Sequence, residues 1–192
     1  MSERLGGCAD PGALDADALA LYRELVHGRR AERPPAFPLT GPSGRLNGPA
    51  ATWLLHPPLG TALERLGATV SYDLTLSARC KETVILTVAH HHDSVFEKYA
   101  HRLGAARAGF TAEETEELCA GRTPASAGPE ERCTHRVART LLADGRLDDA
   151  SHAEALAVLG PKGLFEAVTL TGFYTLLAYQ LGAYAIVPPA GG

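Results

Sequence analysis

The sequence predicts an all-α protein, and three observations lead to this prediction. Apolar residues recur at helical spacing, for example at positions 14, 18, 21, 22 and 25. Proline and glycine interrupt the chain where such periodic segments end. No segment alternates between apolar and polar residues for long enough to build a sheet. Helices that bury apolar faces against one another explain the whole pattern.

Length and composition indicate one globular domain over residues 1–192, with a helix and arm over 1–49 and a helical core over 50–192. The chain has 192 residues, of which 45% are hydrophobic and 21% are charged. These are ordinary values for a globular domain, and the length hardly allows two. The net charge is −4, and no basic stripe could neutralise several phosphates, so we expect no nucleic-acid partner.

The N-terminal part predicts one helix followed by an extended arm. Residues 14–27 form an amphipathic pattern, and Gly28 supplies a C-terminal stop. Residues 29–49 contain five prolines, which exclude helix over most of this stretch. A long irregular segment of this kind acts as a linker, as a lid or as a wrap over a neighbouring subunit.

Two short helices and then a central helical hairpin are expected next. The short helices cover residues 50–55 and 59–67, and His56, Pro57 and Pro58 separate them. The hairpin consists of residues 77–89 and a second helix from the 90–93 turn to about residue 108, where Gly109 ends it. Thr111 and Glu114 then predict a capping box at the start of the following helix.

The remaining helices are expected over residues 129–143, 148–159 and 163–187, with a turn at 144–145 and a break at Gly160–Pro161. The last of them is apolar over roughly the length that a bilayer requires. Glu166 and Gln180 favour a buried core or interface helix instead, so we expect no membrane span.

Four cysteines lie far apart and form no CxxC pair: Cys8, Cys80, Cys119 and Cys133. This favours buried, unreactive thiols in a reducing compartment over a zinc site or a dithiol centre. The N-terminus has no basic region followed by an apolar run, as a signal peptide would. A cytoplasmic location is therefore expected.

The densest polar cluster is HHHDSVFEKYAH at residues 90–101, where Ser94, Glu97 and His101 have i, i+3 and i+7 spacing. This spacing places all three on one side of a helix, so hydroxyl, carboxylate and imidazole groups can meet in one pocket. A carboxylate beside an imidazole is suited to proton transfer near neutral pH.

Structural alternatives remain open for the same residues. Ser94 and Glu97 match a capping box, and Asp93 is an equally good N-cap. Glu97 and His101 could form a surface ion pair. A metal site of His91, Glu97 and His101 is a further alternative, although adjacent histidines point in different directions, and solvated or pocket-lining histidines are favoured. We expect no metal and no cofactor.

Three segments form one recognisable pattern: LSARCKETVILTVAH at 76–90, SVFEKYAH at 94–101 and ARAGFTAEETEEL at 106–118. Together they resemble the core hairpin of the carboxymuconolactone decarboxylase and alkylhydroperoxidase AhpD superfamily. The resemblance implies an AhpD-like helical fold. It also implies a homo-oligomer, a trimer or a hexamer, for which the apolar last helix and the proline-rich arm offer surface.

In the peroxidase branch of that superfamily, a glutamate is followed at fixed spacing by two cysteines and a histidine. Counting from Glu82 places Ser94 and Glu97 at the cysteine positions and His101 at the histidine position. Neither residue can serve as a redox thiol, so dithiol peroxidase activity is not expected.

The resemblance then implies the decarboxylase branch, which suggests a cofactor-independent lyase or isomerase. Such an enzyme moves protons on a carbonyl- or lactone-bearing small molecule in a biosynthetic or aromatic-degradation pathway. The expected catalytic residues are His101, Glu97 and Glu82. The expected substrate-binding residues are Ser94, His91, His92 and Arg45. Two alternatives stay open: a non-catalytic ligand-binding or scaffold protein, and a metal-dependent enzyme that uses the histidine cluster.

Overall fold

A computed structural model describes residues 4–5, 10–28 and 37–189. It divides the chain into two compact units, one formed by Met1–Asp73 with Tyr179–Gly192 and one formed by Leu74–Ala178. Within the described residues, every regular element is helical, and the only β pairing is an isolated bridge between Thr40 and Leu46. The all-α prediction is confirmed, whereas the single domain stays a prediction.

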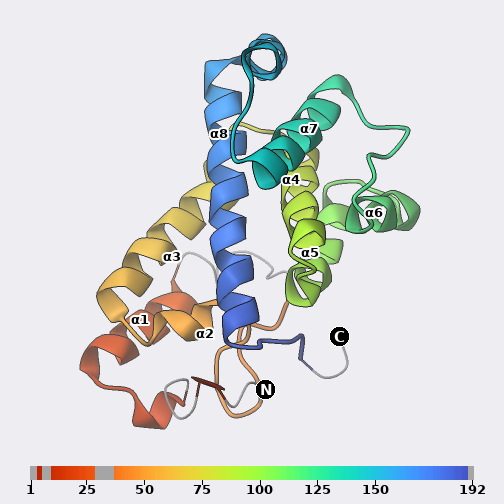
Figure 1. Cartoon of the computed structure of the whole chain (residues 1–192). Coiled ribbons are helices and arrows are strands. Elements are labelled where there is room, and N and C mark those ends of the chain that lie inside the picture. Colours follow the sequence, from red (N-terminus) through yellow and green to blue (C-terminus); the bar gives the residue numbers. More distant parts are fainter. Residues whose placement is uncertain (1–3, 6–9, 29–36, 190–192) are drawn as a thin grey trace. The chain divides into compact units, whose positions relative to one another are not determined.

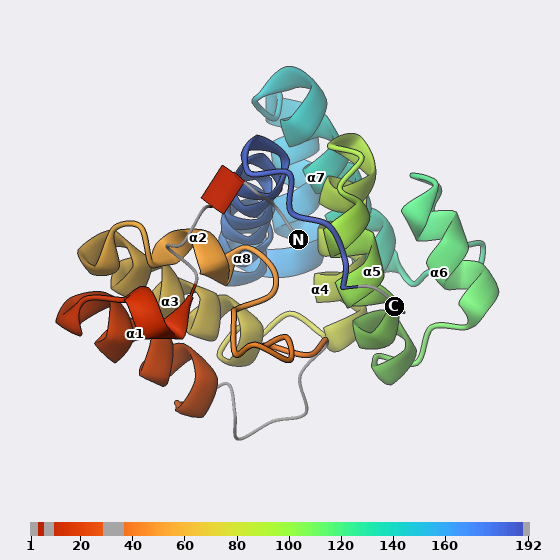
Figure 2. The same cartoon turned by 90° about the horizontal axis from the view of Figure 1, so that it is seen from below.

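The first unit contains a short 3-10 helix, η2 (Pro11–Ala13), and the helices α1 (Ala16–His27), α2 (Ala50–Trp53) and α3 (Pro57–Tyr72). Helices α1 and α2 both pack against α3, and Figure 2 shows α1 running beside α3. The described part of the proline-rich arm, residues 37–48, is non-helical as expected. The rest of the predicted arm, residues 29–36, lies outside the described residues.

Helix α3 is longer at both ends than the predicted 59–67 helix. The two prolines that were expected to separate helices occupy the first turn of α3. Backbone N–H groups in a first turn have no acceptor within the helix, so proline, which lacks an N–H, costs no hydrogen bond there. The His56 Nδ1 atom accepts a hydrogen bond from the Leu59 backbone N–H at 3.2 Å and caps this end. The sequence HPP therefore begins a helix here instead of ending one.

The second unit is built around α4 (Ala78–His91), which contacts α5 (Val95–Arg107), α6 (Ala112–Cys119) and α7 (Pro129–Asp144) (Figure 1). Val84, Leu86 and Val88 of α4 are completely buried. Because α4 is buried on almost every side, its sequence is a nearly continuous apolar run. The predicted central hairpin is confirmed as α4 and α5.

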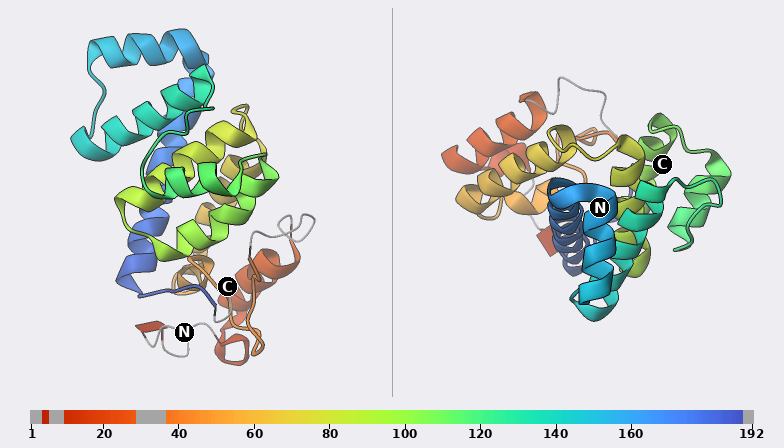
Figure 3. Two further views of the ribbon diagram at one scale, coloured as in Figure 1. Left: turned by 90° about the vertical axis from the view of Figure 1, so that its right-hand side faces the viewer. Right: turned by 90° about the horizontal axis from the view of Figure 1, so that it is seen from above.

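Helix α8 (Asp149–Ala183) contains the predicted break, because Gly160 has φ 67° and ψ 173° and Pro161 follows it. The segment before the break turns back along α7, as the left view of Figure 3 shows, and Cys133, Val137, Ala155 and Leu164 share one apolar cluster there. None of the helices in the described part of the chain has the length and apolar character that crossing a membrane requires.

Glu166 of α8 fixes the segment that leads into α4. Its carboxylate accepts hydrogen bonds of 2.8–3.0 Å from the Thr75 N–H, the Thr75 hydroxyl and the Leu76 N–H. Burial opposes ionisation, but these bonds outweigh it, and the pKa of Glu166 is lowered. Glu166 is only 4% exposed, which agrees with the expectation that the last helix is a core or interface helix.

Candidate active site

The turn between α4 and α5 brings the predicted polar cluster together. Helix α4 ends with its C-cap at His92, Asp93 adopts a left-handed backbone with φ 47°, and Ser94 is the N-cap residue of α5. Asp93 is therefore not the N-cap, and its carboxylate instead pairs with Lys98 at 2.8 Å. Aspartate tolerates this left-handed conformation better than most residues.

Glu97 is a buried carboxylate that no hydrogen bond satisfies. It is 3% exposed, and neither of its oxygens has a hydrogen-bond partner. Burial raises its pKa to about 7, although the nearby Ser94 hydroxyl and the charge of His101 favour ionisation. The Ser94 side chain makes no cap bond, and its hydroxyl oxygen is also buried without a partner. The capping-box alternative for Ser94 and Glu97 is wrong.

His101 is held by Glu82, which lies on the neighbouring helix. The His101 Nδ1 atom lies 2.9 Å from Glu82 Oε2, and both side chains are 16% exposed. Burial disfavours the imidazolium, but the charges of Glu82 and Glu97 outweigh this effect and raise the pKa of His101. The alternative of a surface ion pair between Glu97 and His101 is wrong, because the partner that binds His101 is Glu82.

Two further residues shape this cluster and were not predicted from the sequence. Gly104 of α5 lies against Glu82, so close that a Cβ atom there would be 2.6 Å from Glu82 Oε1. The Tyr174 ring of α8 meets His101 edge to face at 5.1 Å between ring centroids. An unexplained glycine inside a helix, three residues after the candidate histidine, is the signal that could have revealed Gly104. Tyr174 has no comparable local signal.

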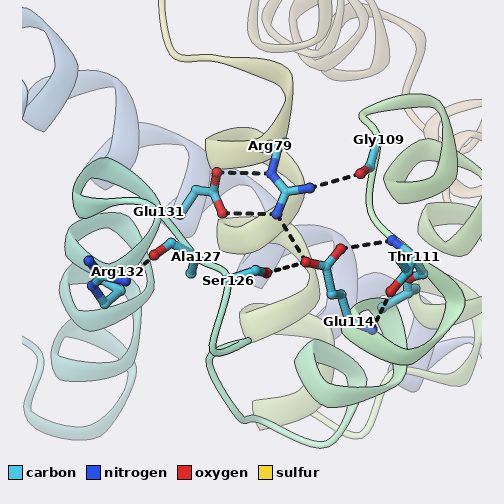
Figure 4. A network of polar contacts seen from close by, with 9 residues as sticks. Arg79, Gly109, Thr111, Glu114, Ser126, Ala127, Glu131 and Arg132 are labelled. Carbon is cyan, nitrogen blue, oxygen red and sulfur yellow. Dashed lines mark hydrogen bonds and ion pairs between the residues drawn. The ribbon is translucent and has the colours of Figure 1, made fainter.

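Arg79, a cation near the cluster in sequence, is fully engaged elsewhere (Figure 4). Its guanidinium binds both Glu131 oxygens at 2.9 and 3.2 Å and donates to the Gly109 carbonyl at 2.9 Å. It also lies 3.6 Å from Glu114 and 3.7 Å from the centroid of the Phe110 ring. Arg79 therefore joins α4, α6 and α7 and is not available to a substrate.

Three predicted substrate-binding residues remain, namely His91, His92 and Arg45. His91 is exposed at the end of α4, and its ring meets that of His92 at 4.8 Å between centroids. Burial and the charge of His91 lower the pKa of His92. Arg45 belongs to the other compact unit. Substrate binding by these three residues stays a prediction.

Three of the four cysteines, namely Cys80, Cys119 and Cys133, are buried and free, and burial raises the pKa of each thiol. The prediction that the thiols are buried is confirmed for these three, their lack of reactivity stays a prediction, and Cys8 lies outside the described residues. No group of three or more histidine, cysteine, aspartate or glutamate residues in the described part of the chain is arranged to hold a metal ion.

Comparisons with known proteins agree with this architecture. A model of the carboxymuconolactone decarboxylase family matches residues 57–140, which include the whole Glu82, Ser94, Glu97 and His101 cluster. No curated protein is significantly similar to the chain in sequence. Among solved structures, an uncharacterized peroxidase-related protein from Silicibacter sp. TM1040 matches with a TM-score of 0.67 and 14% identity, over 82% of this chain and 93% of that one. This likeness confirms the AhpD-like fold and says nothing further about activity.

Proposed function

We propose that this chain, whose residues 57–140 match the carboxymuconolactone decarboxylase family, is a cofactor-independent lyase or isomerase. Its reaction moves a proton to or from carbon beside the carbonyl group of a small keto acid or lactone acid. The observation that carries the proposal is Glu97, a buried carboxylate with both oxygens unpartnered and a pKa of about 7. Such a group takes up and releases a proton at neutral pH.

Glu97 acts as the base in this proposal. Ionised Glu97 removes the proton from the carbon next to the carbonyl, and the electron pair of the broken C–H bond moves onto the carbonyl oxygen as an enolate. In a decarboxylation, the pair comes from the broken C–C bond as CO₂ leaves, and protonated Glu97 or His101 returns a proton to carbon. Water is kept from the base because Glu97 is only 3% exposed.

His101 stabilises the negative oxygen, and Glu82 positions His101. The Glu82 carboxylate accepts a hydrogen bond from His101 Nδ1–H at 2.9 Å, which leaves Nε2 as the atom that donates to the enolate oxygen. The same contact raises the pKa of His101, so the imidazole stays protonated to higher pH. Ser94, whose buried hydroxyl has no partner, supplies a second donor.

The proposal is tested by deuterium exchange into a panel of small keto acids and lactone acids in D₂O, followed by ¹H NMR. The intact protein should exchange the proton beside the carbonyl of at least one compound, and Glu97→Gln should slow this exchange by about 100-fold or more. Glu113→Gln replaces an exposed carboxylate of α6 and serves as the matched control. Binding of a compound without exchange, or unchanged exchange in Glu97→Gln, would contradict the proposal and favour the ligand-binding alternative.

We also propose a homo-oligomer that buries the exposed apolar side of α8. Phe165 is 70% exposed, Val168 39% and Leu176 38%, and their spacing places them on the same side of the helix. Apolar side chains gathered on one helix face are typical of a subunit contact. A trimer or hexamer, a cytoplasmic location and a role in aromatic degradation or biosynthesis stay predictions.

A further inference from the structure

A second polar pocket lies in the Leu74–Ala178 unit and shares no residue with the Glu82, Ser94, Glu97 and His101 cluster. It is lined by α7, by the C-terminal end of α4 and by the loop that follows α6, and its volume is about 780 Å³. A pocket of this size holds a small organic molecule. The proposed proton transfer makes no use of it.

One wall of this pocket carries three arginines of α7. Arg132, Arg136 and Arg139 have i, i+4 and i+7 spacing, which places them along one side of the helix. Asp144 is the only acidic residue in the lining, and Glu154 pairs with Arg136 at 2.6 Å. The exposed Arg139 forms no hydrogen bond or ion pair with the described part of the chain. The wall is therefore cationic and retains an unused guanidinium, a group whose planar fork fits carboxylate and phosphate oxygens.

His135, on the same helix, adds a buried polar atom without a partner. The residue is 4% exposed and lines the pocket, its Nδ1 atom lies 2.8 Å from the Thr123 hydroxyl, and its Nε2 atom is buried with no hydrogen-bond partner. A buried polar atom of this kind is costly unless a ligand or water satisfies it. Burial and the charge of Arg139 lower the pKa of His135 to about 4 and outweigh a contact with the Gly121 backbone that favours the protonated ring, so the ring is neutral at pH 7. When the Thr123 hydroxyl donates to Nδ1, the Nε2 atom carries the ring proton and is a hydrogen-bond donor.

The opposite wall is held in place by backbone contacts. The His90 Nδ1–H donates to the Cys119 carbonyl at 3.2 Å, because a carbonyl oxygen can only accept. Gly121 has φ 75°, and a Cβ atom on it would lie 2.5 Å from the His90 ring. The chain can pass this close to His90 only at a glycine. The loop after α6 is thus fixed against the end of α4, and Thr123 is positioned to bind His135.

We propose that this pocket binds a small molecule that bears a multiply charged oxyanion, either a phosphate group or clustered carboxylates. Arg139 binds the charged oxygens together with the N–H groups of Arg132 other than the one that donates to the Ala127 carbonyl, and the Nε2–H of His135 donates one further hydrogen bond. The pocket contains no residue of the Glu82, Ser94, Glu97 and His101 cluster, although the predicted substrate-binding residue His91 is part of its lining. Its ligand is a second molecule, distinct from the substrate of the proposed proton transfer.

The test uses the intact chain, with inorganic phosphate and citrate as probes and the ionic strength held constant with sodium chloride. Backbone amide and imidazole ¹⁵N resonances are followed by NMR at pH 7.5. We expect saturable shifts confined to Gly121, Thr123 and α7, together with a shift of the His135 imidazole nitrogens. Phosphate alone producing them would identify a phosphate ligand, and citrate alone a carboxylate ligand.

Arg139→Gln provides the decisive variant, because Arg139 is exposed and its replacement leaves the packing intact. Loss of one charge-assisted pair should weaken probe binding by about tenfold. Arg107→Gln changes an exposed arginine of α5 outside the pocket and should leave binding unchanged. The proposal is overturned if neither probe gives saturable shifts, or if Arg139→Gln and Arg107→Gln bind equally well. Deuterium exchange by the intact protein is an independent readout, so failure of either proposal leaves the other in place.

Discussion

Replacing Glu97 by glutamine should change how the stability of the protein depends on pH. Burial raises the pKa of Glu97 from 4.5 to about 7. Between these values the folded protein binds a proton that the unfolded chain has released, so the stability of the wild type falls as the pH rises from 4.5 to 7. The shift of about 2.5 units corresponds to about 3 kcal/mol, and above pH 7 the whole of this loss is present.

Glutamine keeps the shape of the side chain and cannot ionise, so Glu97→Gln removes this pH dependence. Urea unfolding followed by circular dichroism at pH 4.5 and pH 8, at one protein concentration, gives the free energy of unfolding of both proteins. The difference between variant and wild type should move by about 3 kcal/mol in favour of the variant between the two pH values. Any cost of burying the glutamine amide is the same at both pH values, so it cancels from this change.

Glu113→Gln is the control, because Glu113 is an exposed carboxylate of α6 and its removal should affect both pH values alike. A difference between Glu97→Gln and wild type that is equal at pH 4.5 and pH 8 would refute the reasoning. It would mean that Glu97 is solvated or paired in solution, and the assignment of Glu97 as the base would lose its support.

Four further predictions follow from the same contacts. Glu166→Gln should lower the free energy of unfolding by about 1–3 kcal/mol at pH 7 in urea titrations. Folding lowers the pKa of Glu166. The stability that this carboxylate contributes is therefore fully present above the ordinary pKa of a carboxyl group, and it is lost as the pH falls through the pKa of Glu166 in the folded protein. The free energies of unfolding of variant and wild type should therefore converge in acid. The rate of deuterium exchange should rise as Glu97 ionises near pH 7 and fall at higher pH when His101 loses its proton, giving a bell-shaped profile. Phe165→Asp should convert the oligomer to smaller species in light scattering, without loss of helical circular dichroism. Thr111→Ala should cost about 1 kcal/mol of stability in thermal unfolding, because Thr111 caps α6.

Most of the helices could be predicted because local sequence signals mark where they begin and end. The capping box of Thr111 and Glu114 is present, with both of its hydrogen bonds made, and Gly160 breaks the last helix where glycine and proline meet. Helix α3 shows where prediction from local signals alone fails. Two prolines in succession indicate an interruption unless a side chain caps the helix that they begin, and His56 does so here.

The candidate site was only partly predictable, because its chemistry depends on contacts between helices. Spacing along α5 placed Ser94, Glu97 and His101 on one side of the helix. It did not show that the partner of His101 is Glu82, on α4, or that Tyr174 of α8 covers the same imidazole. Helical periodicity gives the face that each residue occupies and carries no information on which face of another helix lies opposite. The pocket beside α7 was missed for the same reason, since His135 has no local motif around it.

The pattern of a hydroxyl residue followed three positions later by glutamate occurs at both 94–97 and 111–114, with opposite results. Thr111 is exposed at the start of α6, so Glu114 can turn back to the Thr111 backbone N–H, and the two residues cap the helix. Ser94 and Glu97 are 8% and 3% exposed and make no such bonds. The burial that leaves the Glu97 carboxylate unsatisfied destabilises its charged form and is also what brings its pKa close to 7. Stability and reactivity at Glu97 therefore have one origin, and the unfolding and exchange experiments on Glu97→Gln must succeed or fail together if Glu97 is the base.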